Sequence, residues 1–205
     1  MDIGANSCSY RVNIFGYPNA RGLNSSEINL GLLDQRLGIE WVRDNIAAFG
    51  GDASRITLWG QSAGAESTDL YNFNYVKDPI VSGLIMDSGT VYLTQGTQDP
   101  IHSNFTFVAE NLGCGNLSAK AELQCMRKVD VQEIESFVGH YIDSNATKQI
   151  TFTPTYNNVS FFNADTYTAK SIAGNYSRLV RLLSYFARWS CAKKYIAFYH
   201  RYRQR

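Results

Sequence analysis

The segment Gly60-Gln61-Ser62-Ala63-Gly64 constrains the fold of this chain more than any other. It follows the apolar run of residues 55–59 and opens a stretch of small residues, a pattern that predicts a strand, a sharp turn and the start of a helix. Small neighbours leave room for strand and helix to meet, while the serine adopts a strained conformation that holds its oxygen clear of the sheet. Ser62 is therefore a candidate nucleophile, and the alternative is a glycine-rich loop without a catalytic role.

A helix is predicted from about residue 30 to Gly50-Gly51, because apolar residues recur there in steps of three and four. We expect the following residues to form one stripe that covers a sheet: Leu30, Leu33, Leu37, Trp41, Val42, Ile46 and Phe49. Strand-like runs occur at residues 10–15, 55–59 and 82–87, with helices between them. This alternation favours an α/β fold with a mostly parallel sheet flanked by helices. Reactive groups in such sheets collect at the carboxyl ends of the strands, where Ser62 and Ser88 fall.

Several further segments carry a family resemblance: residues 10–18, 29–46, 49–52, 69–73 and 79–90. Together with the pentapeptide they resemble the type-B carboxylesterase/lipase family, which includes cholinesterases and microbial lipases. The last two segments look closer to the fungal members. The resemblance runs from about Tyr10 to about Leu179 and implies that residues 1–179 are part of an α/β-hydrolase domain. It also implies cleavage of small-molecule or lipid carboxylic esters through an acyl intermediate on Ser62.

The resemblance assigns roles to individual residues as well. Gly60, Gln61 and Gly64 would form the turn around the nucleophile, and the amide of Ala63 would be one donor to the oxyanion. The family's other donors come from a loop upstream of Tyr10. Ser88 matches a serine that hydrogen-bonds the acid of the catalytic triad, unless it is a plain strand-end serine. Arg11 and Asp34 match a buried ion pair with a structural role.

A serine nucleophile needs a histidine base that is oriented by a carboxylate. The chain offers His102, His140 and His200, and only Ser62, Asp165 and His200 follow the serine, acid, histidine order of this fold. The family resemblance places both the acid and the histidine downstream of residue 179, so this trio is not favoured. We therefore expect the chain by itself to hydrolyse esters poorly or not at all. His102 and His140 are expected at the surface or at helix ends.

Residues 180–205 form a basic tail that does not match the family. Eight of the 19 lysines and arginines lie at or beyond Arg178, where no acidic residue occurs. One interpretation is an amphipathic segment for nucleic acid or a membrane surface. The other is an unselected sequence from a shifted reading frame or an unspliced intron, which is favoured because the tail lacks a clean apolar face. Nucleic acid is not an expected partner.

The cysteines and possible glycosylation sites indicate an oxidising compartment. The resemblance implies a disulfide between Cys114 and Cys125, and the alternative is two free thiols. Six N-x-S/T sequons begin at Asn24, Asn104, Asn116, Asn145, Asn158 and Asn175. Both features favour a secreted parent protein, although residues 1–8 do not resemble a signal peptide and no run is long enough to span a membrane.

No cofactor is expected, since no metal-ligand spacing or phosphate-binding loop is visible. Two other functions are also compatible with the sequence. One is a non-catalytic binding module on the same fold, and the other is an inactive truncated product.

Overall fold

The computed structural model describes residues 3–94, 98–176, 180–184 and 196–201, which divide into two compact units. Unit 1 comprises Met1–Tyr10, Leu32–Gly96 and Phe162–Arg205, and unit 2 comprises Arg11–Gly31 and Thr97–Phe161. The predicted boundary at residue 179 and much of the basic tail lie outside the described residues.

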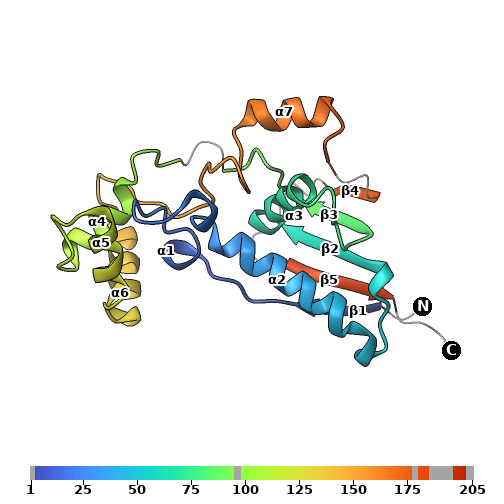
Figure 1. The fold of residues 1–205 in the computed structure, drawn as a ribbon. Helices are drawn as coiled ribbons and strands as arrows, with labels where there is room; N and C mark the ends of the chain where they lie inside the picture. The colour runs from blue at the N-terminus through green and yellow to red at the C-terminus, as the bar shows by residue number, and fades with distance from the viewer. Residues whose placement is uncertain (1–2, 95–97, 177–179, 185–195, 202–205) are drawn as a thin grey trace. The chain divides into compact units, whose positions relative to one another are not determined.

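Unit 1 is built on a five-stranded sheet (Figure 1). Its strands are β1 (Ile3–Ser7), β2 (Ile56–Gln61), β3 (Gly83–Asp87), β4 (Val180–Ser184) and β5 (Ile196–Arg201). They lie in the order β1-β5-β2-β3-β4, with β2, β3 and β4 parallel and β5 antiparallel to both of its neighbours. Four of these described strands therefore run in one direction. The predicted α/β class is confirmed, and two strands within residues 180–205 belong to the sheet.

Two helices cover one face of this sheet. They are α2 (Leu30–Asn45), which continues into the 3-10 turn η2 (Ile46–Phe49), and α3 (Ala63–Asn74), while a second short turn, η3 (Ala53–Arg55), leads into β2. The sheet residues Ile56 and Leu58 alternate with half-buried residues, so they face one side, where they pack with apolar residues of both helices. The buried cluster consists of Ile39, Val42, Ile46, Ile56, Leu58, Tyr71, Val81 and Leu84.

The predicted helix is confirmed, and it ends where the sequence indicates. Gly50 follows η2 in the left-handed conformation with φ 79°, which glycine adopts without steric cost. The predicted apolar stripe, however, is wrong for several of its members. Leu33, Leu37, Trp41 and Phe49 are 43% to 65% exposed.

The helix packs on the sheet through Ile39, Val42 and Ile46 instead, of which only Val42 and Ile46 belong to the predicted stripe. Both sets of residues recur in steps of three and four, so periodicity could not choose between them. The predicted strand at residues 10–15 is also wrong. The first strand, β1, ends at Ser7, and α1 (Asn13–Gly16) is a single helical turn that opens with Asn13 at φ 54°.

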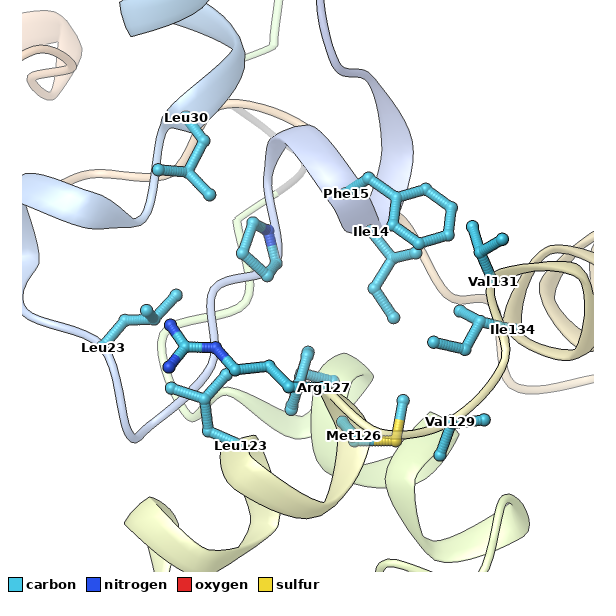
Figure 2. A pocket seen from close by; sticks show the side chains of 12 residues that line it. Ile14, Phe15, Leu23, Leu30, Leu123, Met126, Arg127, Val129, Val131 and Ile134 are labelled. Carbon is cyan, nitrogen blue, oxygen red and sulfur yellow. The ribbon is translucent and has the colours of Figure 1, made fainter.

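Unit 2 is helical and has its own core. Besides α1 it contains η1 (Ser25–Glu27), α4 (Ser103–Asn111), α5 (Ala119–Met126) and α6 (Val131–Asp143). Its buried cluster includes Ile14, Phe105, Val108, Cys114, Leu123, Met126, Ile134 and Val138. A disulfide joins Cys114 to Cys125 with 5.7 Å between the Cα atoms, which confirms the predicted pair and ties the loop after α4 to α5. Figure 2 shows several of the core side chains around a cavity.

The last helix, α7 (Ala164–Ile172), belongs to unit 1. Tyr167 is fully buried, and its ring lies 5.1 Å from the ring of Phe73 at the end of α3. The Tyr167 hydroxyl also accepts a hydrogen bond from the amide of Phe162 at 3.0 Å. One aromatic side chain therefore attaches α7 to the helix that follows Ser62.

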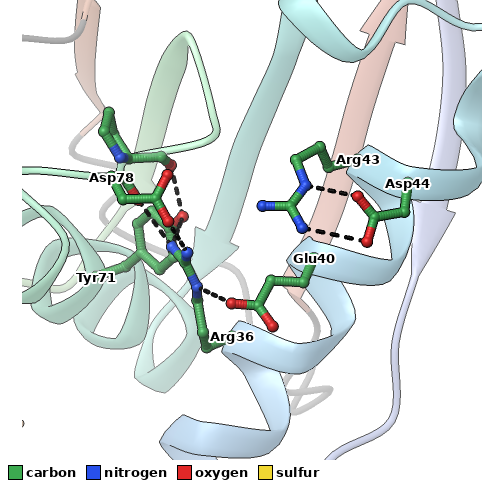
Figure 3. A network of polar contacts seen from close by, with 7 residues as sticks. Arg36, Glu40, Arg43, Asp44, Tyr71 and Asp78 are labelled. Carbon is green, nitrogen blue, oxygen red and sulfur yellow. Dashed lines mark hydrogen bonds and ion pairs between the residues drawn. The ribbon is translucent and has the colours of Figure 1, made fainter.

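A network of polar contacts centred on Arg36 joins α2 to α3 (Figure 3). The buried guanidinium donates to Glu40 Oε1 at 2.7 Å, to the Tyr71 hydroxyl at 2.9 Å and to the Asp78 carbonyl at 2.8 Å, and it pairs with the Asp78 carboxylate. It also lies 4.3 Å from the centre of the Tyr75 ring. Arg43, two turns further along α2, pairs only at the surface with Asp44 in the same view.

Arg36→Ala is expected to lower the free energy of unfolding by about 2–3 kcal/mol, because it removes charge-assisted hydrogen bonds that fasten α3 and the segment before β3 to α2. Arg43→Ala is the matched control and should leave the unfolding free energy nearly unchanged, because an exposed ion pair contributes little. Urea unfolding followed by circular dichroism would measure both. Equal effects of the two variants would contradict a structural role for the buried network.

Candidate active site around Ser62

Ser62 occupies a sharp turn between β2 and α3. Its backbone has φ 56° and ψ −118°, a sparsely populated conformation for a residue with a side chain that costs on the order of 1–3 kcal/mol. Two hydrogen bonds hold the turn: the Ser62 amide donates to the Asp87 carbonyl at 2.9 Å, and the Ser62 carbonyl accepts from the Glu66 amide at 3.0 Å. The half-buried side chain thus sits on a backbone that is fixed from both sides.

Glycines make this turn sterically feasible. A Cβ atom on Gly60 would lie 2.0 Å from the Gly64 carbonyl oxygen, and one on Gly89 would lie 2.4 Å from the Ser62 carbonyl oxygen. Real Cβ atoms do not approach backbone atoms so closely. Strand, helix and the segment after β3 can therefore converge at Ser62 only where side chains are absent.

The amide of Ala63, the predicted oxyanion donor, stands at the first position of α3. Amides in the first turn of a helix have no carbonyl partner within the helix, and the helix dipole adds positive potential there. This position suits a donor to a developing negative charge. The role itself stays a prediction.

Ser88 lies at the same edge of the sheet as Ser62. The parallel register pairs Gln61 with Asp87, so the two serines follow paired residues at the carboxyl ends of β2 and β3. Ser88 is exposed and has φ 57°, another left-handed position that is uncommon for serine. The structure therefore places both serines where the sequence predicts, while the hydrogen bond from Ser88 to an acid stays a prediction.

Two buried carboxylates of α3, which no sequence motif marks, anchor the segment after β3. Glu66 is 2% exposed, and its Oε1 accepts from the Thr94 amide at 3.0 Å and from the Thr94 hydroxyl at 2.6 Å. Asp69 is 7% exposed, and its Oδ2 accepts from the Val91 amide at 3.1 Å. The only signal in the sequence is acidic residues on a helix that turns out to be buried all round.

Burial is the main cause that raises the pKa of Glu66, and the nearby charge of Asp69 adds to it, while the hydrogen bonds from Thr94 oppose it.

A side-chain hydrogen bond also joins the two neighbouring strands: the Trp59 indole N–H of β2 donates to the Asp87 carboxylate at the end of β3. The ends of β2 and β3 beside the Ser62 turn are thus joined by a side-chain hydrogen bond as well as by the backbone hydrogen bonds of the sheet.

The remaining candidates for the triad are dispersed. Asp165 is exposed in the first turn of α7, and no hydrogen bond joins it to Ser62 within the described residues. His200 is in β5, and its side chain lies outside what the structure describes. His102 precedes the first residue of α4, with its Nδ1 2.9 Å from the Asn19 carbonyl oxygen, and His140 is exposed in the last turn of α6. Both are helix-end residues, as predicted.

Arg11 and Asp34 belong to different units, so their pairing stays a prediction. In the part of the chain that the structure describes, no group of three or more histidine, cysteine, aspartate or glutamate side chains could hold a metal ion. None of the described helices is long and apolar enough to cross a membrane.

The sequons differ in accessibility. Five asparagines are exposed: Asn24, Asn116, Asn145, Asn158 and Asn175. Asn104 is 7% exposed, and its side-chain amide donates to the Thr151 carbonyl at 2.9 Å. That amide would have to leave the core before it could carry a glycan, so in this structure Asn104 has a packing role.

Comparisons with known proteins agree with this geometry. The model of the carboxylesterase family matches residues 7–182. The chain is 47% identical over 171 residues to a chlorogenic acid esterase of Aspergillus niger, an alignment that covers 83% of this chain and 32% of the relative. It is 48% identical over 133 residues to a secreted lipase of Gibberella zeae (63% and 25%) and 34% identical over 151 residues to a mouse cholinesterase (73% and 25%). The alignments thus span about a quarter to a third of the length of these relatives.

Gly60→Ala should abolish folding or lower the free energy of unfolding by at least about 3 kcal/mol, since the added methyl group would overlap the Gly64 carbonyl. The control is Gly139→Ala in α6, where a Cβ would meet no atom within 4 Å. A gain of about 0.5–1 kcal/mol is expected there, because alanine favours the helix. Chemical unfolding of the two variants checks this, and a Gly60→Ala protein as stable as the wild type would show that the turn is not confined as described.

Glu66→Gln tests the buried carboxylate, because glutamine keeps an oxygen that can accept from Thr94. A group whose folded pKa is raised supports the fold below its unfolded pKa, about 4.3, and loses that support as pH rises through the folded pKa. The wild type should therefore lose stability relative to Glu66→Gln as pH rises from about 4 toward 8. Unfolding free energies of both proteins across this range would measure the difference, and a constant or opposite difference would refute the raised pKa.

Proposed function

Because the chain belongs to the carboxylesterase family, we propose that the whole protein is a carboxylic ester hydrolase that forms an acyl intermediate on Ser62. The observation that carries this proposal is the strained turn that presents the Ser62 hydroxyl between β2 and α3. A strained strand-turn-helix is the setting in which a serine nucleophile is held exposed above such a sheet.

In the proposed reaction the Ser62 oxygen attacks the carbonyl carbon of the ester while a histidine accepts the hydroxyl proton. Negative charge develops on the carbonyl oxygen, where the Ala63 amide would donate a hydrogen bond. The bond to the alcohol oxygen then breaks, and the alcohol leaves with the proton from the histidine. Water attacks the acyl-serine by the same route, which releases the carboxylic acid and restores Ser62.

We further propose that the 205-residue chain by itself hydrolyses esters poorly or not at all. The reaction needs a histidine and an orienting acid, which the family resemblance places downstream of residue 179, and a second oxyanion donor, which it places upstream of Tyr10. Loss of a single oxyanion donor typically lowers turnover by about 100- to 1,000-fold.

The names of the relatives support the proposed class of substrate and the compartment. One is a chlorogenic acid esterase and others are secreted lipases, so small-molecule or lipid esters are the proposed substrates. The disulfide of unit 2 and the exposed sequons agree with a secreted protein.

Labelling with a fluorophosphonate tests the mechanism in two proteins. In the whole protein, Ser62→Ala should lower hydrolysis of a nitrophenyl ester by at least about 10⁴-fold and abolish labelling, because the nucleophile is lost. Ser171→Ala, an exposed serine of α7, is the control and should change neither. In the 205-residue chain, labelling of Ser62 should remain far below one group per chain.

The acyl-serine mechanism and the inactivity of the 205-residue chain can be refuted independently of each other. Hydrolysis that survives Ser62→Ala in the whole protein would refute the acyl-serine mechanism. Stoichiometric modification of Ser62 in the 205-residue chain would refute only the proposed inactivity of that chain.

A further inference from the structure

Unit 2 contains a cavity of about 310 Å³ that the proposed reaction does not use (Figure 2). All the residues that line it belong to unit 2, so it is formed without any contribution from unit 1. Its volume lies at the lower end of the range of about 300–1,000 Å³ that is usual for small-molecule sites. The cavity is therefore large enough for a small ligand.

The inner wall of the cavity is apolar and belongs to the core of unit 2. Ile14, Phe105, Leu123, Met126 and Ile134 line it, and each is less than 9% exposed. These residues come from α1, α4, α5 and α6, which the core of the unit holds together. A hollow with such walls is poorly suited to water, which needs polar partners, and suits an apolar group instead.

The outer wall carries the one charged residue among those that line the cavity. Arg127, at the end of α5, is exposed, and Figure 2 shows its side chain extended past the cavity toward Leu23. Val131, at the start of α6, is 56% exposed and marks the open side. A ligand whose chain filled the hollow would thus leave its polar end in water beside a guanidinium. That arrangement complements a carboxylate, which arginine can bind through two hydrogen bonds.

We propose that unit 2 binds an aliphatic monocarboxylate, such as a medium-chain fatty acid, with its chain in this cavity and its carboxylate at Arg127. Burial of the chain supplies most of the affinity, because the lining is apolar. Arg127 supplies the preference for an acid over the corresponding alcohol. The site is separate from the chemistry proposed for Ser62, so it does not depend on ester hydrolysis.

Equilibrium dialysis of the full chain against butanoate, hexanoate and octanoate tests the apolar part. Affinity should rise by about fourfold for each added methylene until the cavity is filled. Leu23→Trp, which places a large ring at a half-buried wall position, should weaken octanoate binding. Affinity that does not depend on chain length, or no saturable binding, would overturn the proposal.

The charged part is tested by comparing octanoate with octanol. Arg127→Gln should weaken octanoate binding by about two- to fivefold, as expected for an exposed ion pair, and leave octanol binding unchanged. Lys128→Gln is the matched control, because Lys128 is exposed next in the chain but does not line the cavity. An equal loss in both variants would show that net charge attracts the acid and would refute a site at Arg127.

A photoreactive fatty acid with a diazirine in its chain locates the site. Cross-links should fall on the segment from Leu123 to Ile134, and they should persist in Ser62→Ala, since the cavity does not involve that serine. Cross-links confined to the surroundings of Ser62 would overturn the inference while leaving the proposed esterase function intact. Hydrolysis that survives Ser62→Ala in the whole protein, together with retained cross-links, would refute the acyl-serine mechanism and leave this inference intact.

Discussion

The close approach of strand and helix on either side of Ser62 is the constraint on which unit 1 depends. Gly60 and Gly64 bring the end of β2 so near to α3 that not even a methyl group fits between them. The backbone of Ser62 is strained as a result, and it is kept in place by the hydrogen bond that its amide donates to the Asp87 carbonyl and the one that its carbonyl accepts from the Glu66 amide. Asp87 is the last residue of β3 and accepts the hydrogen bond from the Ser62 amide. The geometry of the candidate nucleophile therefore depends on the parallel pairing of β2 with β3.

The interior position of α3 follows from the same packing. Every residue from Gly64 to Phe73 is buried, including five with polar or charged side chains. Buried polar groups are tolerated where they form hydrogen bonds. Ser67 and Thr68 donate to carbonyls of their own helix, while Glu66 and Asp69 accept from the segment after β3. The surroundings of Ser62 are thereby held by a rigid helix on one side and an anchored segment on the other, as a preorganised site requires.

Unit 2 is stabilised in a different way from unit 1. It has no strand among its described residues, and its core comes from short helices joined by a disulfide. Five of the six sequons fall in this unit, as does the disulfide, so the features that indicate a secretory compartment are concentrated there. The exposed sequons and the disulfide both suit a helical unit in an oxidising environment. The hollow beside Arg127 is part of the same core and needs no residue of the sheet.

The sequence by itself determined the features that depend on local chemistry. The small residues around Ser62 require a tight turn, Gly50 ends the long helix, and the resemblance correctly paired Cys114 with Cys125. Tertiary structure decided which stripe of α2 faces the sheet, since Leu30, Leu33 and Leu37 recur in the same steps of three and four as Ile39, Val42 and Ile46.

Tertiary structure also decided that residues 10–15 are not a strand and that Glu66 and Asp69 are anchors inside the protein. An apolar pattern specifies the kind of surface an element carries, but the partner that buries it comes from elsewhere in the chain. Burial, and with it the role of a carboxylate, therefore becomes visible only when distant segments meet.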